Sequence, residues 1–217
     1  MKIAILGATG MSGQTIYREA VDRGHDVTAF VRNESKAKET LGDDAKLKVA
    51  DVFELTTEDL TPFEVVVNAL GTPRGHDMGY LHIDMAAHLI RILRNTTSPR
   101  IFFMLGAASL LDKDGNPFID SFVKDTSSAS WIDTPLMQVH EYHFLQTVTN
   151  VNWVGIYPSL SYGPGPKTGY VRNDKNQALF DSSGKPNLTT GNLATALLDE
   201  IEAPSINQAR FTVGNND

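Results

Sequence analysis

Short apolar runs alternate along this chain with longer stretches in which apolar residues recur at helical steps. The runs are rich in valine, isoleucine and phenylalanine, a composition typical of buried strands. Strands are therefore expected at residues 3–6, 25–31, 47–50, 63–70, 101–105, 151–157 and 210–213. Helices are expected after the first strand, as a short polar helix after the second, and at residues 78–94, 134–148 and around 193–201.

Strands that alternate with helices in this way favour an α/β fold, in which a doubly wound parallel sheet carries helices on both faces. The sequence contains no internal repeat and no domain linker, so residues 1–217 are expected to form a single domain. Two connections are unusually long, at residues 110–132 and 158–188. Because irregular loops of this length tend to be functional, both are expected to border a ligand.

The first strand runs directly into a glycine-rich turn that opens the first helix. Gly7, Gly10 and Gly13 follow one another at three-residue steps. Gly7 suits a tight turn, Gly10 the close approach of phosphates, and Gly13 the close packing of helix on strand. Free N–H groups in such a turn, with the positive end of the helix, favour an anionic pyrophosphate.

This position in the chain predicts a Rossmann-type dinucleotide site, although the usual spacing is G-x-G-x-x-G and a purely structural turn is the alternative. The residues expected to contact the pyrophosphate are Gly7, Thr9, Gly10, Met11, Ser12 and Gly13. Ligands of doubly wound sheets bind at the carboxyl ends of the strands. The other candidate residues are therefore those that come just after a predicted strand.

Arg32 is the most informative of them, because it closes the second strand without a neighbouring carboxylate. An acidic residue at this place usually holds the ribose of NAD(H), whereas a guanidinium can bind a 2′-phosphate. The sequence thus favours NADP(H) over NAD(H), with a solvated loop arginine as the alternative. Asp51 and Val52 are expected beside the adenine, although a turn or cap role for Asp51 is equally open.

The remaining candidates lie at the ends of the fourth and sixth predicted strands or directly after them. Small residues there would let the cofactor lie against the backbone, and a proline would hold the nicotinamide end through backbone contacts. These candidates are Asn68, Ala69, Leu70, Gly71, Tyr157, Pro158 and Ser159.

Charge and composition narrow the possible partners. The net charge of −7 argues against nucleic acid or an anionic membrane as the main partner. The chain contains no cysteine, which removes disulfides, thiolate nucleophiles and cysteine-ligated metals. No apolar run reaches the roughly 20 residues that cross a bilayer. We therefore expect a cytoplasmic protein with a small-molecule partner, and the oligomeric state stays open.

Together these motifs resemble an atypical short-chain dehydrogenase/reductase. The second half of the chain narrows the resemblance, through the segments WVGIYP at 153–158, GPG at 163–165, TGY at 168–170, LLDEIE at 197–202 and RFTVG at 210–214. These are similar to the NADH-flavin reductase-like proteins, relatives of the biliverdin/flavin reductases. The resemblance covers essentially the whole chain and implies hydride transfer to a flavin (FMN or FAD) or a similar planar acceptor, such as a quinone.

The chain departs from the short-chain dehydrogenase/reductase pattern at one point. Typical members carry a Tyr-x-x-x-Lys pair on the helix before the sixth strand, and those two places hold Thr134 and Gln138 here. Reduction of a flavin does not need that pair, because solvent can supply the proton. Ser109 stands where the superfamily has its catalytic serine, with a loop hydroxyl as the alternative, and Tyr142 is either a proton donor or a packing residue.

Two other functions remain open on the sequence. The missing pair also suits a non-catalytic redox sensor that binds NADP(H) and contacts another protein. An epimerase or dehydratase is less favoured, since the chain is short for an added substrate domain. His82 and His88 are expected on a helix surface, and no metal site is expected at His140 and His143 because no carboxylate pattern beyond Glu141 accompanies them.

Overall fold

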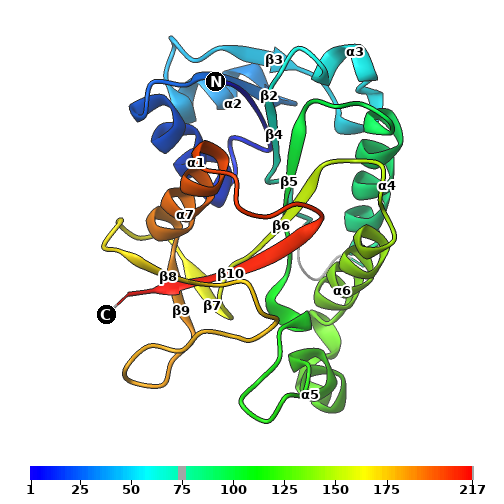
Figure 1. Ribbon diagram of the computed structural model, residues 1–217, viewed down its shortest axis with the longest axis vertical. Helices are drawn as coiled ribbons and strands as arrows, with labels where there is room; N and C mark the ends of the chain where they lie inside the picture. The colour runs from blue at the N-terminus through cyan, green and yellow to red at the C-terminus, as the bar shows by residue number, and fades with distance from the viewer. Residues whose placement is uncertain (73–76, 217) are drawn as a thin grey trace.

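The computed structural model describes residues 1–72 and 77–216. An eight-stranded sheet forms its centre, with the strands in the order β3-β2-β1-β4-β5-β6-β10-β8 (Figure 1). The strands of this sheet are β1 (Lys2–Leu6), β2 (Asp26–Val31), β3 (Leu47–Val49), β4 (Val65–Asn68), β5 (Arg100–Met104), β6 (Trp153–Tyr157), β8 (Tyr170–Asn173) and β10 (Ala209–Asn215). All neighbouring pairs are parallel except β8 with β10.

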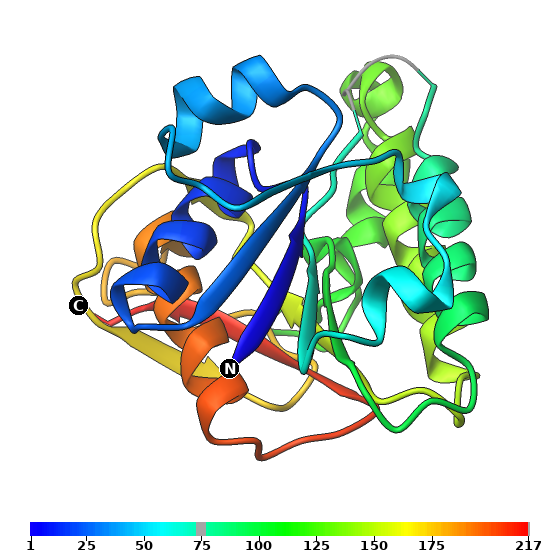
Figure 2. The same ribbon diagram turned by 90° about the horizontal axis from the view of Figure 1, so that it is seen from above.

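Helices cover both faces of the sheet, as Figure 2 shows. One layer contains α1 (Met11–Asp22), α2 (Glu34–Leu41) and α7 (Thr190–Glu202). The opposite layer contains α4 (Leu81–Leu93) and α6 (Asp133–Gln146), with the short α3 (Thr57–Leu60) beside α4. The predicted α/β fold with a doubly wound, largely parallel sheet is therefore confirmed, and its reversal between β1 and β4 creates the crevice where such folds bind ligands.

The central strands are hydrophobic throughout because both of their faces are buried. In β1, Ile3 and Ile5 pack against the layer of α1 and α7, whereas Ala4 and Leu6 pack against the layer of α4 and α6. All four are at most 2% exposed. This alternation explains why the strand shows no polar positions after Lys2 and why the first glycine marks its end so clearly.

Both long connections contain secondary structure, which corrects the expectation of irregular loops. The first holds α5 (Phe118–Lys124) and a 3₁₀ turn at Thr126–Ser130. The second holds β8 together with β7 (Ser161–Gly163) and β9 (Asn187–Thr189), which pair as a separate two-stranded sheet. These elements have seven residues or fewer, too short for a clear apolar period in the sequence.

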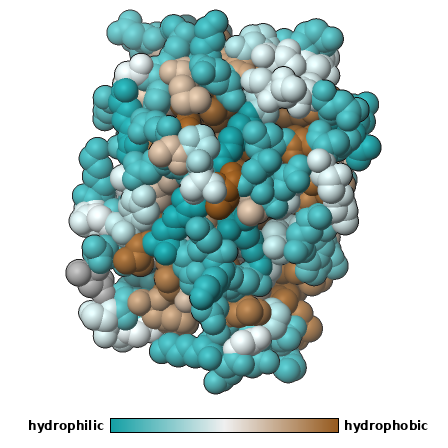
Figure 3. Space-filling model, in the orientation of Figure 1, coloured by the Kyte–Doolittle hydropathy of each residue, from teal (hydrophilic) through white to brown (hydrophobic). Residues whose placement is uncertain are grey.

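The surface seen in Figure 3 is mainly hydrophilic, and its hydrophobic residues form separate patches. Within the described residues, no helix is long and apolar enough to cross a membrane.

Candidate functional site

The glycine-rich turn has the geometry of a phosphate loop. Gly7 takes a φ of +79°, which favours glycine, and a Cβ there would come within 2.9 Å of the Ala69 carbonyl oxygen. A Cβ on Gly13 would overlap the Gly7 carbonyl, so helix and strand can meet this closely only with glycine. Gly10 caps α1 without a side-chain hydrogen bond, which leaves the first N–H groups of the helix available to an anion.

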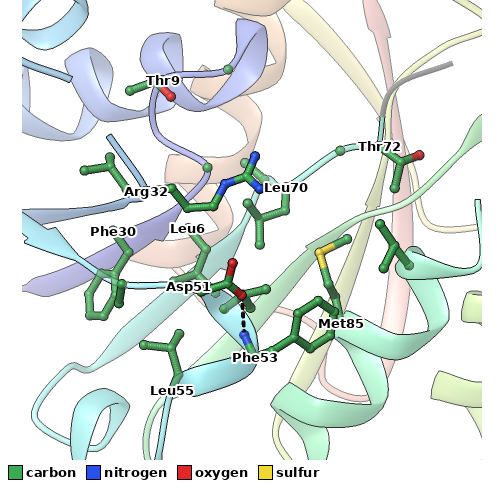
Figure 4. A pocket seen from close by; sticks show the side chains of 18 of the residues that line it. Leu6, Thr9, Phe30, Arg32, Asp51, Phe53, Leu55, Leu70, Thr72 and Met85 are labelled. Carbon is green, nitrogen blue, oxygen red and sulfur yellow. Dashed lines mark hydrogen bonds between the residues drawn. The ribbon is translucent and has the colours of Figure 1, made fainter. Parts of the chain in front are cut away.

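A cavity of about 370 Å³ opens beside this turn at the carboxyl ends of β1, β2 and β4. Figure 4 shows Arg32 and Asp51 directed into it from neighbouring segments, above an apolar floor. Predicted cofactor residues that line the cavity are Gly7, Thr9, Gly10, Arg32, Asp51, Val52, Ala69, Leu70 and Gly71. The sequence-derived set is therefore brought together largely at one place.

The two charged residues of the cavity differ in how they are held. Arg32 is exposed, and its side chain forms no hydrogen bond or ion pair with any residue that the structure describes. Asp51 accepts a hydrogen bond from the backbone N–H of Phe53 at 3.0 Å and thereby caps a 3₁₀ turn at Val52–Glu54. The cap role of Asp51 is observed, and its second carboxylate oxygen has no partner among the described residues.

Sequence reasoning missed the apolar wall of the cavity. Phe30, Phe53, Leu55, Met78, Leu81 and Met85 line it from β2, the turn after β3, and the start of α4. Thr72 also lines it, and the Thr72 Oγ1 atom is enclosed without a hydrogen-bond partner among residues 1–72 and 77–216. An enclosed hydroxyl of this kind is suited to a bound polar group. The only indication of this wall in the sequence is that Phe53 directly follows the Asp51-Val52 motif.

Other predicted residues lie outside the cavity lining. The Asn68 Oδ1 atom accepts from the Leu70 N–H at 3.4 Å and shapes the backbone next to Gly71. The Ser12 hydroxyl bonds to the Tyr162 hydroxyl at 2.8 Å, which joins the first turn of α1 to β7. Ser159 is buried and donates to the Leu179 carbonyl. Met11, Gly13 and Pro158 are likewise absent from the lining.

Ser109 and Tyr157 belong to a buried network rather than to an open surface. The Ser109 hydroxyl donates to the Tyr157 hydroxyl at 3.0 Å, and Arg210 Nη1 donates to both, at 3.1 and 2.7 Å. The Tyr157 side chain is fully buried, and burial raises its pKa, so the phenol stays protonated. The Tyr157 side chain is therefore engaged in this network and is absent from the cavity lining.

Tyr142 packs against this network. Its ring lies 3.7 Å from the Arg210 guanidinium carbon and meets the Tyr157 ring edge-on. Burial raises the pKa of Tyr142 as well. This placement agrees with the packing alternative, since the ring stacks on a cation inside the fold.

Residues 7–204 match the family model for NAD(P)H-binding proteins. The chain belongs to the NAD(P)H-binding family.

Three relatives match this chain over nearly its whole length. An uncharacterised protein of Bacillus subtilis is 35% identical over 224 residues, which cover 98% of each chain. A crystal structure from Lactobacillus casei matches the whole of both chains at 43% identity, with a TM-score of 0.94. A Streptococcus pneumoniae protein provisionally named an NADH-flavin reductase also matches over both full lengths, at 29% identity and a TM-score of 0.87. The resemblance to NAD(P)H-binding, reductase-like proteins is thus confirmed.

The residues present fit the cofactor of an NAD(P)H-binding protein. The glycine turn packs so closely on the backbone that a Cβ at Gly7 or Gly13 would crowd neighbouring main-chain atoms, and the first turn of α1 has no side-chain cap on its N–H groups. The apolar wall suits an adenine ring, with Asp51 at its edge. Thr9, Gly10, Arg32 and Asp51 are therefore the residues that would hold the dinucleotide.

Gln138, which the resemblance places where short-chain dehydrogenases carry a lysine, lies against the turn that follows β5. A Cβ added to Gly106, just after β5, would overlap the Gln138 side chain. The helix therefore approaches the sheet edge at Gln138. Its neutral amide cannot act as a lysine does in lowering the pKa of a tyrosine.

His82 corrects the expectation of a surface residue, because it is only 4% exposed. It faces α6, where the Glu141 carboxylate lies 3.6 Å from the His82 Nδ1 atom. His88, in contrast, is half-buried and bonds to the Leu55 carbonyl. The helix pattern failed at His82 because a second helix covers that side of α4.

Proposed function

We propose that the protein is an NAD(P)H-dependent oxidoreductase that reduces a flavin or a similar planar acceptor such as a quinone. The observation that carries the proposal is the cavity itself, in which a glycine phosphate loop and a nucleotide-sized apolar wall meet. The bound dinucleotide supplies a hydride. The chain's residues hold the dinucleotide: the turn at Gly7–Gly13 binds its pyrophosphate, and the apolar wall around Met85 binds its adenine.

The source of the proton also bears on the choice of acceptor. Thr134 and Gln138 replace the Tyr-Lys pair, and the Ser109 hydroxyl already donates its proton to the Tyr157 hydroxyl. Acceptors that take their proton from solvent therefore suit this chain better than simple carbonyls. The name of the Streptococcus pneumoniae relative supports the same class of acceptor.

The acceptor side is assigned to the two long connections. In the first, α5 packs against the 3₁₀ turn at Ala107–Ser109 and against α6. Phe122 stacks on Phe118 and meets Trp131 edge-on, so an aromatic group borders this turn. We infer that this group and Ser109 form one wall of the acceptor site, where the remaining lone pair of Ser109 can accept a hydrogen bond.

Titration of the purified protein with NADPH and NADH, followed by turnover assays with FMN, FAD and a quinone, tests the proposal. We expect saturable binding and acceptor-dependent NAD(P)H oxidation well above the uncatalysed rate. Binding without turnover on any acceptor would instead support the second candidate, a redox sensor. The engaged Ser109 hydroxyl and the absent Tyr-Lys pair are the observations that favour that alternative.

Arg32→Ala should lower the preference for NADPH over NADH by about one to two orders of magnitude. A charge-assisted contact between a guanidinium and a phosphate contributes roughly 1.5–3 kcal/mol, and NADH has no 2′-phosphate to lose. Dissociation constants for both dinucleotides provide the measurement. Arg94→Ala is the matched control, because Arg94 is an exposed arginine at the far end of α4. An unchanged NADPH/NADH ratio in Arg32→Ala would refute the assignment.

A further inference from the structure

Two arginines of this protein are buried to the same extent but are neutralised differently. Arg100 and Arg210 are each 8% exposed. The Arg100 guanidinium forms an ion pair with the Glu200 carboxylate and also donates to two backbone carbonyls. Arg210 has no carboxylate within ion-pair distance among residues 1–72 and 77–216. It is therefore a buried cation whose counter-charge the described chain does not provide.

The Arg210 guanidinium is only partly satisfied. Its Nη1 donates to the hydroxyls of Ser109 and Tyr157, and its flat face stacks on Tyr142. The Nε and Nη2 groups have no hydrogen-bond partner in the described chain. Neither nitrogen is completely enclosed by protein. These N–H groups thus remain free to donate, from a side chain that is more than nine-tenths buried.

The surrounding groups do not compensate the charge. Burial raises the pKa of both Tyr142 and Tyr157, so neither phenol becomes a phenolate near neutral pH. A buried cation without an anionic partner is destabilising, and stacking on aromatic rings offsets only part of that cost. Residues that cost stability in this way are expected at functional sites.

The position of Arg210 connects it to the proposed acceptor side. Ser109 ends the 3₁₀ turn that follows β5, on the same edge of the sheet as the glycine turn. Arg210 reaches that turn from β10. The guanidinium that carries the free N–H groups donates to the Ser109 hydroxyl through its Nη1 atom. The positive charge is therefore placed against the wall that the acceptor is proposed to contact.

We propose that Arg210 binds an anionic oxygen of the acceptor, so that the enzyme selects acceptors bearing a phosphate, carboxylate or sulfonate. The inference rests on the proposed reductase function and specifies its substrate class. Guanidinium groups bind such oxyanions through charge-assisted hydrogen bonds, which are the strong ones. Ser109 and Tyr157 hold the guanidinium at Nη1, which leaves the other nitrogens to the ligand.

Riboflavin and FMN form the matched probe pair, because they share the isoalloxazine ring and differ by one phosphate. We expect the wild-type protein to have a higher kcat/KM for FMN than for riboflavin. Arg210→Met should reduce the FMN/riboflavin ratio about 10- to 100-fold, chiefly through KM for FMN, and Arg210→Lys should restore part of it. Equilibrium titration of both flavins in the presence of NADP⁺ gives the same comparison without turnover.

Arg172→Met is the control. Arg172 also stacks on an aromatic ring, that of Phe211, but it is paired with Glu200 and Asp174. Its loss should lower the melting temperature and leave the FMN/riboflavin ratio unchanged. Arg210→Met should show the reverse: a changed ratio with a melting temperature that is equal or higher.

The outcomes separate the two proposals. If riboflavin and FMN are reduced equally well and Arg210→Met only lowers the melting temperature, Arg210 is a structural residue and the inference is wrong, while the reductase function stands. If no acceptor is reduced, the reductase function fails. In that case the flavin titrations still decide the inference, and equal or absent binding of FMN and riboflavin overturns it.

Discussion

Gly13→Ala should strongly weaken dinucleotide binding and destabilise the protein at the same time. The new methyl group would overlap the Gly7 carbonyl and crowd the Ala8 Cα atom, and all of these are backbone atoms at the junction of β1 and α1. Overpacking of this kind costs about 1–3 kcal/mol, and α1 can relieve it only by moving away from the turn. That movement would misplace the N–H groups that face the pyrophosphate.

The size of the binding effect depends on how many hydrogen bonds to the pyrophosphate are broken. Each hydrogen bond to a charged phosphate contributes roughly 1.5–3 kcal/mol, so breaking two should weaken binding by at least about 100-fold. Chemical denaturation and NADPH titration measure the two effects separately. Gly163→Ala is the control, because Gly163 has a negative φ and open space around its Cα.

Gly10→Ala separates the effect on protein stability from the effect on dinucleotide affinity. A Cβ there approaches only the Gly7 carbonyl, at 3.2 Å, which a small shift can accommodate. This variant should therefore keep most of its stability while losing affinity for the dinucleotide, because the methyl group would occupy the approach of the phosphates. Wild-type affinity in both Gly10→Ala and Gly13→Ala would show that the pyrophosphate binds elsewhere.

The fold was predictable because its signal is local. Each core strand is a short apolar run buried on both faces, and β1 leads into its turn within a few residues. The long connections were not predictable for the opposite reason. The three-residue strands β7 and β9 are held by pairing with each other from opposite ends of a long connection, and no periodic pattern precedes that pairing.

The same distinction applies to the site. The glycine turn, Arg32 and Asp51 follow predicted strands directly, so the order of elements is enough to place them along one edge. The apolar wall draws Met85 from α4 and Phe53 from a turn much earlier in the chain, and such packing appears only in three dimensions. Arg210 and Ser109 are 101 positions apart in the chain, so their contact could not be predicted from the sequence either.

Glu141 is the second residue whose replacement should have a large effect. The side chain is 1% exposed, and its Oε2 atom has no hydrogen-bond partner in the part of the chain that the structure describes. Burial raises the pKa of Glu141 well above its ordinary value. Burial also lowers the pKa of His82, its neighbour across the α4–α6 interface, to about 4, against an opposing effect of Asp133.

The two residues give stability opposite dependences on pH. Above about pH 4.5 an unfolded chain releases the Glu141 proton whereas the folded chain keeps it, so stability falls with rising pH until the folded pKa is passed. His82 acts in the other direction: stability falls as the pH drops from about 6.5 through 4, because only the unfolded chain binds the proton readily. Between these limits the two slopes oppose each other.

Glu141→Gln should therefore stabilise the protein at neutral pH and change the shape of its pH profile. The amide has no carboxyl proton to lose, so the variant should gain up to about 1.4 kcal/mol per pH unit relative to the wild type above pH 4.5. The free energy of unfolding by urea, measured from pH 4 to 8, provides the test. His82→Gln is the complementary variant and should steepen the fall of stability with rising pH between 4.5 and 6.5. A constant difference between wild type and Glu141→Gln across that range would show that Glu141 ionises at the same pH in both states, and burial would then not govern its protonation.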